Sequence, residues 1–336
     1  MSRDGFLAGA TTPERVLELT PADLLSSVRR VTNAARHVAI DDAAIEAWAV
    51  RFDSARLASL EASPLDDVTG SPAEIARFVL LIDALNFCFW SHQPIETTWR
   101  GRRVVRYTAF VALMAEAVQR EHRWLEPAYW SEVDAAKLRR VVAGAGELLM
   151  IEERAAVLRE TGRVLLERFG GSLTKLAEAS NHRAWRVALM LADSFPSFRD
   201  VAEHAGRRVW LLKRAQICAM DLSTAWTRRG WPGLSGLDDL TAFADYRIPQ
   251  ILRHLGILRV APALAERIEA RRGLAAGSVE EVELRAATID AVDRMRQAVA
   301  KRGNSVPAWR IDVALWEDSH AADVSVEHHR VCTIYY

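Results

Sequence analysis

Apolar residues recur every three or four positions along most of this 336-residue chain. This period places them on one face of an α-helix and predicts a mainly helical fold. We expect helices over residues 20–35, 41–51, 75–90, 107–120, 132–150, 152–169, 173–192, 215–222, 249–256, 262–272, 279–301 and 307–320. Two short segments, 37–40 and the start of 207–214, are expected as extended chain, so the fold holds at most a small β element.

Local signals mark several of the helix boundaries. Thr20 precedes Pro21, as a capping residue precedes a proline of the first helical turn. Ser71 and Glu74 have the capping-box spacing of a hydroxyl followed three residues later by a glutamate. Pro196 cannot continue a helix, so the helix over 173–192 must end before it.

The chain shows no internal division. No linker rich in proline, glycine or serine, no repeat and no low-complexity run separates one part from another. We therefore expect one domain over residues 1–336, with residues 1–20 as a loosely ordered N-terminal segment. The aromatic tail, 332–336, is expected to dock on that domain.

Composition narrows the class of protein. The 44 Lys and Arg residues balance 44 Asp and Glu residues, which disfavours binding to a long nucleic acid. The three cysteines are widely spaced and form no CxxC pair, so neither a disulfide framework nor a structural zinc site is expected. Since no signal sequence and no long apolar run is present, we expect a soluble cytoplasmic protein.

A polar cluster between two apolar runs is the strongest local candidate for a site. Asp245, Tyr246 and Arg247 form it, and Pro249 follows as a residue suited to the first position of a helix. Asp245 is then expected in a turn between buried segments, where a catalytic carboxylate becomes plausible. A helix cap or a structural ion pair explains the same pattern, and this stretch alone does not separate these interpretations.

Other polar residues stand in apolar surroundings. In a helix that begins at Pro307, Asp312 and Trp316 share one face, and Glu317 lies near it. Carboxylates beside a tryptophan suit a flat ligand with several N–H donors, although an exposed acidic helix face fits the spacing equally well. The motifs GxGxxG, HExxH and GxSxG and the P-loop are absent, and no metal-ligand spacing is found.

Several of these stretches together resemble one protein family. The segments are 194–200 (SFPSFRD), 213–217 (KRAQI), 243–247 (FADYR) with Pro249 and Gln250, 86–90 (NFCFW) and 334–336 (IYY). In this order and spacing they resemble the queuosine salvage protein family. Its members are queuosine 5′-phosphate N-glycosylase/hydrolases, which release the base queuine from queuosine 5′-monophosphate. The resemblance also implies a helical fold like that of the helix-hairpin-helix DNA glycosylases.

The resemblance implies roles for individual residues. Asp245 looks like the family's catalytic aspartate, and Phe243 looks like a residue that packs on the base. Asp312 and Glu317 look like the carboxylates that hold queuine, although a glutamate replaces a family aspartate at Glu317. Two further matches are weaker: Val313 stands where the family has a tyrosine, and His37 is similar to a histidine on the ligand side. Tyr246 and Trp316 are expected beside them as substrate-binding residues.

The implied reaction agrees with the chemistry of these side chains. Cleavage of the bond between ribose and base builds positive charge on the sugar, which a carboxylate such as Asp245 can stabilise, capture covalently, or relieve by activating water. Lys213, Arg199 and Arg247 are the cations nearest by motif for the 5′-phosphate, although each could instead form a structural salt bridge. No step requires a metal or an organic cofactor.

The expected partners are small molecules. They are the substrate queuosine 5′-monophosphate and the product queuine, with no nucleic-acid polymer, no membrane and a monomeric protein. Two other classes of function stay open. One is a DNA or RNA repair glycosylase of the related helical fold, and the other is a protein that binds a modified nucleoside without turnover.

Overall fold

Helices make up most of the chain in this computed structural model, which describes residues 16–57, 63–320 and 324–336. The α-helices of the described residues are α1 (Pro21–Ala34), α2 (Asp42–Arg51), α3 (Pro72–Ala84), α4 (Arg106–Arg120), α5 (Pro127–Trp130), α6 (Ala135–Val141), α7 (Ile151–Phe169), α8 (Leu173–Ala179), α9 (Ala184–Ser194), α10 (Lys213–Thr227), α11 (Arg247–His254), α12 (Pro262–Glu269), α13 (Val279–Ala300) and α14 (Ala308–Asp318). Short 3-10 helices are η1 (Val16–Glu18), η2 (Ser54–Leu57), η3 (Pro64–Asp67), η4 (His122–Leu125), η5 (Pro196–Phe198) and η6 (Leu237–Asp239). The predicted mainly helical class is confirmed.

The strands of the described residues form three antiparallel pairs. They are β1 (Val38–Ile40) with β6 (Leu258–Val260), β2 (Glu96–Trp99) with β3 (Arg102–Val105), and β4 (Val201–His204) with β5 (Arg207–Trp210). The first pair joins distant parts of the chain, with Val38 opposite Val260 and Ile40 opposite Leu258. The other two are local hairpins, and the extended segments predicted near 37–40 and 207–214 are β1 and β5.

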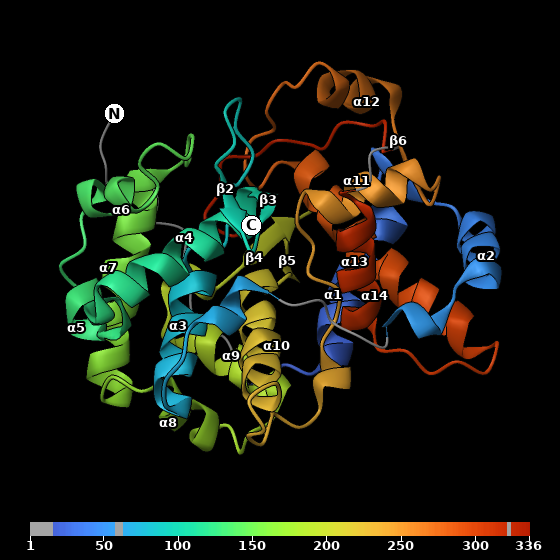
Figure 1. Ribbon diagram of the computed structural model, residues 1–336. Coiled ribbons are helices and arrows are strands. Elements are labelled where there is room, and N and C mark those ends of the chain that lie inside the picture. Colours follow the sequence, from blue (N-terminus) through green and yellow to red (C-terminus); the bar gives the residue numbers. More distant parts are fainter. Residues whose placement is uncertain (1–15, 58–62, 321–323) are drawn as a thin grey trace.

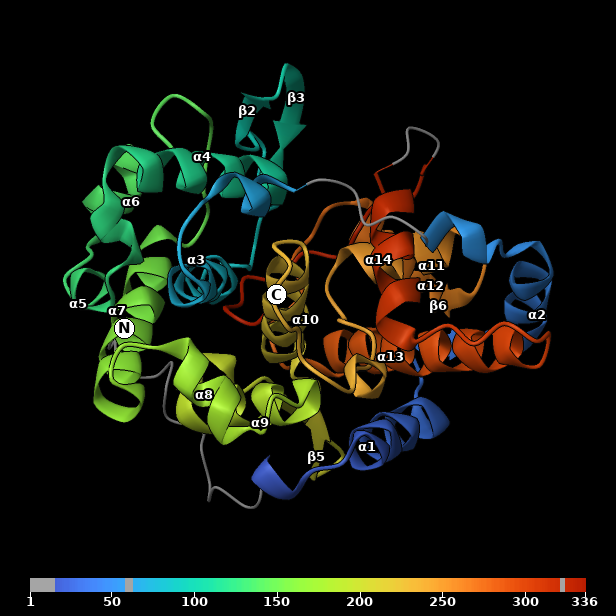
Figure 2. The same ribbon diagram turned by 60° about the horizontal axis from the view of Figure 1, so that its bottom comes forward.

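The helices fall into two groups with α10 between them (Figures 1 and 2). One group contains α3 to α9, and the other combines the N-terminal helices α1 and α2 with the C-terminal helices α11 to α14. Helix α13 packs against α1 and α2, while α10 packs against α3 and α9. The first and the last helices of the described residues therefore build one group, and α10 lies between the two groups.

The boundary signals read from the sequence are confirmed where helices start. The Thr20 side chain accepts a hydrogen bond from the Asp23 N–H in a capping box at α1, and Ser71 and Glu74 make the second capping box at α3. Asp41 caps α2 by accepting from the Ala44 N–H. Gly170 ends α7 in the left-handed conformation (φ +58°), which satisfies the last carbonyls of that helix.

Three helices are shorter than their apolar patterns predict. The helix expected over 75–90 ends at Ala84, because the carbonyls of Leu85, Phe87 and Cys88 accept hydrogen bonds from the buried Arg154 guanidinium instead of helical N–H groups. The helix expected over 132–150 is helical only in α6.

The third difference lies in the segment expected as one helix over 173–192. It is divided into α8 and α9, and Asn181 (φ +53°) and His182 (φ +51°) adopt left-handed backbone between them. Hydrogen bonds to distant residues hold two of these segments, from the Ser235 N–H to the His182 carbonyl and from the Glu147 N–H to the Gln93 carbonyl. Apolar spacing alone could not place ends that depend on such contacts.

The docked C-terminal tail is confirmed. Tyr336 is 2% exposed, its carbonyl accepts a hydrogen bond from the Cys88 N–H, and its ring lies under the Arg285 guanidinium at 4.3 Å. The prediction for residues 1–20 falls mostly on residues 1–15, which lie outside the described residues. Residues 16–20 contribute η1, with Val16 buried, and the cap of α1.

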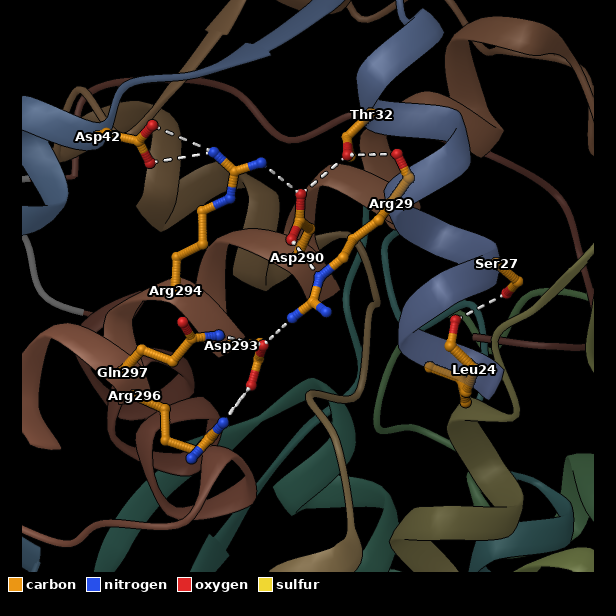
Figure 3. A network of polar contacts seen from close by, with 10 residues as sticks. All are labelled: Leu24, Ser27, Arg29, Thr32, Asp42, Asp290, Asp293, Arg294, Arg296 and Gln297. Carbon is orange, nitrogen blue, oxygen red and sulfur yellow. Dashed lines mark hydrogen bonds and ion pairs between the residues drawn. The ribbon is translucent and has the colours of Figure 1, made fainter. Parts of the chain in front are cut away.

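Two buried aspartates of α13 tie that helix to α1 (Figure 3). Asp290 accepts hydrogen bonds from Thr32 at 2.8 Å and from Arg294 at 2.7 Å, and its other oxygen lies 3.5 Å from Arg29. Asp293 accepts from Arg29 at 2.5 Å. Arg296 and Gln297 donate to Asp293 as well. The side chains of Asp290 and Asp293 are only 1% and 4% exposed. Several donors bind each carboxylate, so these donors replace water as partners of the buried negative charges.

Asp293→Asn is expected to lower the free energy of unfolding by about 1–3 kcal/mol, since hydrogen bonds to a charged acceptor are among the stronger ones. The amide keeps the shape of the side chain but cannot accept from three donors at once. Thermal and urea unfolding of the variant beside the wild type measure the loss. An unchanged unfolding midpoint would show that solvent replaces these contacts without cost.

Candidate active site

A cavity of about 390 Å³ opens between α10, α14, α4 and the loop over residues 243–246. Its size lies in the range of small-molecule sites, roughly 300–1,000 Å³. Most of the residues predicted for the site line it: Lys213, Phe243, Asp245, Tyr246, Asp312, Val313, Trp316 and Glu317. The fold thus brings together three segments that are far apart in sequence.

Asp245 is held by the start of α11. Its Oδ1 accepts hydrogen bonds from the N–H groups of Arg247 at 2.7 Å and Ile248 at 3.0 Å. The helix therefore begins at Arg247, two residues before the predicted position, and it includes Ile248 although a residue that precedes a proline is disfavoured in helical backbone. Pro249 falls within the first turn, where its missing N–H has no helical partner to lose.

This arrangement leaves one oxygen of Asp245 for a ligand. Among the described residues, Oδ2 has no hydrogen-bond donor, and the residue is 8% exposed where it lines the cavity. The two N–H groups that bind Oδ1 fix the orientation of the carboxylate and stabilise its negative charge. Asp245 thus binds the first N–H groups of α11 and also lines the cavity.

Asp312 is the second carboxyl group of the cavity. Its Oδ1 accepts from the Phe243 N–H at 2.9 Å, which ties α14 to the loop that carries Asp245. Burial raises the pKa of Asp312 to about 8, and the negative charge of Asp245 acts in the same direction. Asp312 is therefore mostly protonated at neutral pH, and it can donate a hydrogen bond as well as accept one.

Lys213 supplies a buried positive charge at the first residue of α10. It is 4% exposed, and its Nζ lies 3.5 Å from the Asn86 carbonyl oxygen. Burial lowers the pKa of Lys213, while the charges of Asp245 and Asp83 oppose that shift. At the wall of the cavity, the positive charge of Lys213 is thus attracted by both Asp245 and Asp83.

Aromatic rings form part of the cavity wall. Tyr107 packs edge-on against Trp316, with ring centroids 6.3 Å apart, and against Phe89 at 5.7 Å. Rings at these distances make a stable, rigid surface on which a flat heterocycle can stack. Val313 and Glu317 line the cavity from α14, and Glu317 is exposed at its edge.

Three predicted residues do not line the cavity. The guanidinium of Arg199 donates to the carbonyls of Ala192 and Asp193 at the end of α9. Arg247 is buried beside the cavity and donates to Gln250 Oε1 at 2.9 Å.

The third of them, His37, lies before β1, where its N–H donates to Glu283 and its carbonyl accepts from the Ala261 N–H. Arg199 and His37 are therefore bound through backbone groups, and the Arg247 guanidinium binds a neighbouring side chain.

The structure adds lining residues that the sequence interpretation did not assign. Asp221 lines the cavity from α10, and burial raises its pKa to about 7, against the opposing charges of Lys213 and Arg228. Arg102, Arg103 and Arg228 line the cavity as well. One signal was available: Lys213, Ile217, Asp221, Thr224 and Arg228 follow each other at helical spacing on one face.

The described residues contain no cluster of three or more His, Cys, Asp or Glu side chains that could hold a metal ion. Within the same parts of the chain, no helix has the length and apolar character needed to cross a membrane.

Comparison with known proteins gives a consistent result. A profile described as queuosine salvage protein matches residues 67–336. A protein of Sphaerobacter thermophilus named queuosine 5′-phosphate N-glycosylase/hydrolase is 37% identical over 314 residues, which cover 93% of this chain and 97% of that protein. A protein of the same name from Mus musculus is 32% identical, over 80% of this chain and 83% of that protein. Another from Dictyostelium discoideum is 33% identical, over 78% of each chain.

Proposed function

Because this chain belongs to the queuosine salvage protein family, we propose that it hydrolyses the N-glycosidic bond of queuosine 5′-monophosphate and releases queuine. The reaction consumes one water and yields queuine and ribose 5-phosphate. The observation that carries the proposal is a cavity of ligand size in which one carboxylate oxygen of Asp245 is oriented and has no hydrogen-bond donor among the described residues. The names of the relatives supply the substrate.

Asp245 acts on the sugar in this proposal. As the bond between the ribose and the base breaks, its electron pair moves to the base and positive charge develops on the ribose. The free oxygen of Asp245 stabilises that charge, or bonds to the sugar carbon until water replaces it. Asp245 suits the role because Oδ1 is fixed by two backbone N–H groups, so that no reorientation is needed during the reaction.

Asp312 acts on the base. Queuine is a 7-deazaguanine, so the ring nitrogen that commonly takes a proton in purine cleavage is a carbon. The departing negative charge must be neutralised at the carbonyl or at another ring nitrogen. The protonated carboxyl of Asp312 lines the cavity and can give a hydrogen bond or a proton to those atoms. Glu317 then accepts from the N–H donors of the base.

The 5′-phosphate needs cations. Lys213 is the one predicted cation that lines the cavity, and Arg102, Arg103 and Arg228 line it too. Arg228 is ion-paired with Asp66 of η3 at 2.6 Å, so this pair has to share its charge with an incoming phosphate. We place the phosphate among these lining cations, since Arg199 and Arg247 do not line the cavity.

Further parts of the sequence interpretation belong to the proposal. They are a fold related to the helix-hairpin-helix DNA glycosylases, a monomeric state, and a cytoplasmic location. A cavity with charged groups of both signs suits a mononucleotide better than it suits a duplex, whose phosphates need a broad basic surface.

The test is incubation of the protein with queuosine 5′-monophosphate, followed by detection of free queuine by mass. We expect multiple turnovers, and the same rate in the presence of a chelator. A DNA duplex and an RNA carrying queuosine serve as parallel substrates. Base release from the duplex alone would favour a repair glycosylase, and binding of the mononucleotide without release would favour a binding protein.

A further inference from the structure

We infer that Arg285 and Asp200 are positioning residues for this hydrolysis, and that their buried ion pair sets the loop of Asp245 against the start of α10. The inference rests on the proposed function for its kinetic part. Neither residue lines the cavity, so neither can touch the substrate. Both are 2% exposed, and they come from α13 and from the segment between η5 and β4.

The Arg285 guanidinium uses all three of its nitrogen atoms. Its Nη1 and Nη2 donate to the two oxygens of Asp200 at 2.9 and 2.6 Å, which is a bidentate pair. Its Nε donates to the Ala244 carbonyl at 3.0 Å. Because the guanidinium is planar and rigid, these bonds fix the position of Ala244 relative to Asp200.

Asp200 passes this constraint to α10. Its Oδ2 accepts from the Lys213 N–H at 3.1 Å, and its carbonyl accepts from the N–H groups of Leu211 at 3.2 Å and Leu212 at 3.0 Å. Leu212 has a left-handed backbone (φ +51°), which an ordinary residue adopts only where its surroundings hold it. Asp200 therefore binds the N–H groups of three consecutive residues, 211–213, and sets where α10 begins.

The other end of the clamp is the neighbour of Asp245. The loop over residues 243–245 is held at each residue: Phe243 by Asp312, Ala244 by Arg285, and Asp245 by the first N–H groups of α11. The contact with Arg285 connects Ala244, through Asp200, to the backbone of Lys213. Through it, the negative charge that faces the sugar and the buried positive charge beside it keep a fixed separation.

Such a clamp matters because catalysis by charge depends on geometry. A displacement of about 1 Å of a reacting group can cost on the order of 10²-fold in rate. The ion pair itself gives weak grounds for a stabilising role, since the cost of desolvating two charges offsets much of their attraction. Its geometry accounts for a buried charge pair here: Arg285 binds the Ala244 carbonyl beside Asp245, and Asp200 binds the N–H of Lys213.

The test compares Arg285→Lys with the wild type and with Asp293→Asn, a control on the same helix α13 that acts on stability alone. All rates are measured at a temperature where circular dichroism shows each protein to be folded. Arg285→Lys keeps the charge but loses the bidentate pair or the bond to Ala244. We expect its kcat to fall by about 10- to 100-fold, with KM changed by less than about threefold. Asp293→Asn should keep its kcat.

Asp200→Asn provides the second variant, and it serves alone if Arg285→Lys does not fold. It should lower kcat in the same way, and the double variant should lose little more than the worse single variant, because the two residues act as one unit. A folded Arg285→Lys or Asp200→Asn with the kcat of the wild type would overturn the inference. So would an equal loss of kcat in Asp293→Asn.

Amide hydrogen exchange gives a readout that needs no activity. Arg285→Lys and Asp200→Asn should lose protection at Lys213 and at Arg247 and Ile248, whereas Asp293→Asn should not. Normal protection at both segments would contradict the clamp. If the wild type releases no queuine, the proposed function fails, while the exchange data still decide whether the pair holds the two segments together.

Discussion

Asp245→Asn is expected to abolish most queuine release while the protein stays folded. The amide oxygen can still accept the N–H groups of Arg247 and Ile248, so the start of α11 is preserved. The side chain no longer carries a charge to oppose the cation that develops on the ribose. Losses on the order of 10²–10³ are typical when a group that stabilises transition-state charge is removed, and a lost nucleophile costs more.

Single-turnover measurement of queuine release isolates this chemical step. Asp134→Asn is a matched control, because Asp134 also caps a helix with its side chain, accepting from the Lys137 N–H at 2.8 Å on the exposed start of α6. We expect the control to match the wild type. Release by Asp245→Asn within a few-fold of the wild type would remove Asp245 from the chemical step.

The fold could be predicted from the sequence where a signal is local. The capping residue Thr20 and the capping box at Ser71 need a few neighbouring residues to act, and the structure has them where the pattern placed them. The helix ends near residues 84 and 180 depend on tertiary contacts. The Arg154 guanidinium donates to the carbonyls that would accept helical N–H groups if α3 continued. The apolar pattern around residue 85 cannot predict a contact with an arginine almost seventy residues later.

The candidate site divides in the same way. Asp245, Tyr246 and Asp312 were visible as polar residues in apolar surroundings, and they line one cavity. The partners of the arginines were not visible. Arg199 and Arg247 stand in the motifs, yet their guanidinium groups bind protein acceptors, whereas Arg228 and Asp221 reach the cavity through their face of α10. A long side chain can turn either way, and only its packing decides which.

Asp312→Asn is expected to impair catalysis and to stabilise the protein at the same time. Oδ1 of the amide can still accept the Phe243 N–H, so the loop stays attached to α14. The variant has no proton to give to the departing base. Losses on the order of 10²–10⁴-fold are typical for a missing general acid.

The wild-type rate should depend on pH through this group. Since the pKa of Asp312 is about 8, kcat/KM should fall above that pH as the carboxyl loses its proton. The limb should be missing from the profile of Asp312→Asn, whose rate is low throughout. A wild-type profile that is flat between pH 6 and pH 9.5, or a variant that keeps the wild-type limb, would contradict the role of Asp312 as the acid.

The sign of the stability effect follows from the same pKa. The folded protein holds the Asp312 proton up to about pH 8, whereas the unfolded chain releases it near the ordinary value of 3.8. Between these values the folded state binds more protons, so the contribution of Asp312 to stability falls as pH rises, by up to about 1.4 kcal/mol per pH unit. Below the ordinary pKa both states are protonated and the penalty vanishes.

Asp312→Asn cannot ionise and therefore escapes this penalty. Unfolding in urea should show the variant close to the wild type at pH 4 and more stable by several kcal/mol at pH 8, on the order of the full linkage term. Equal differences at the two pH values would mean that Asp312 is ionised in the folded protein. A variant that is slower and more stable only at high pH would show that the fold tolerates a buried acid at this position because the reaction needs its proton.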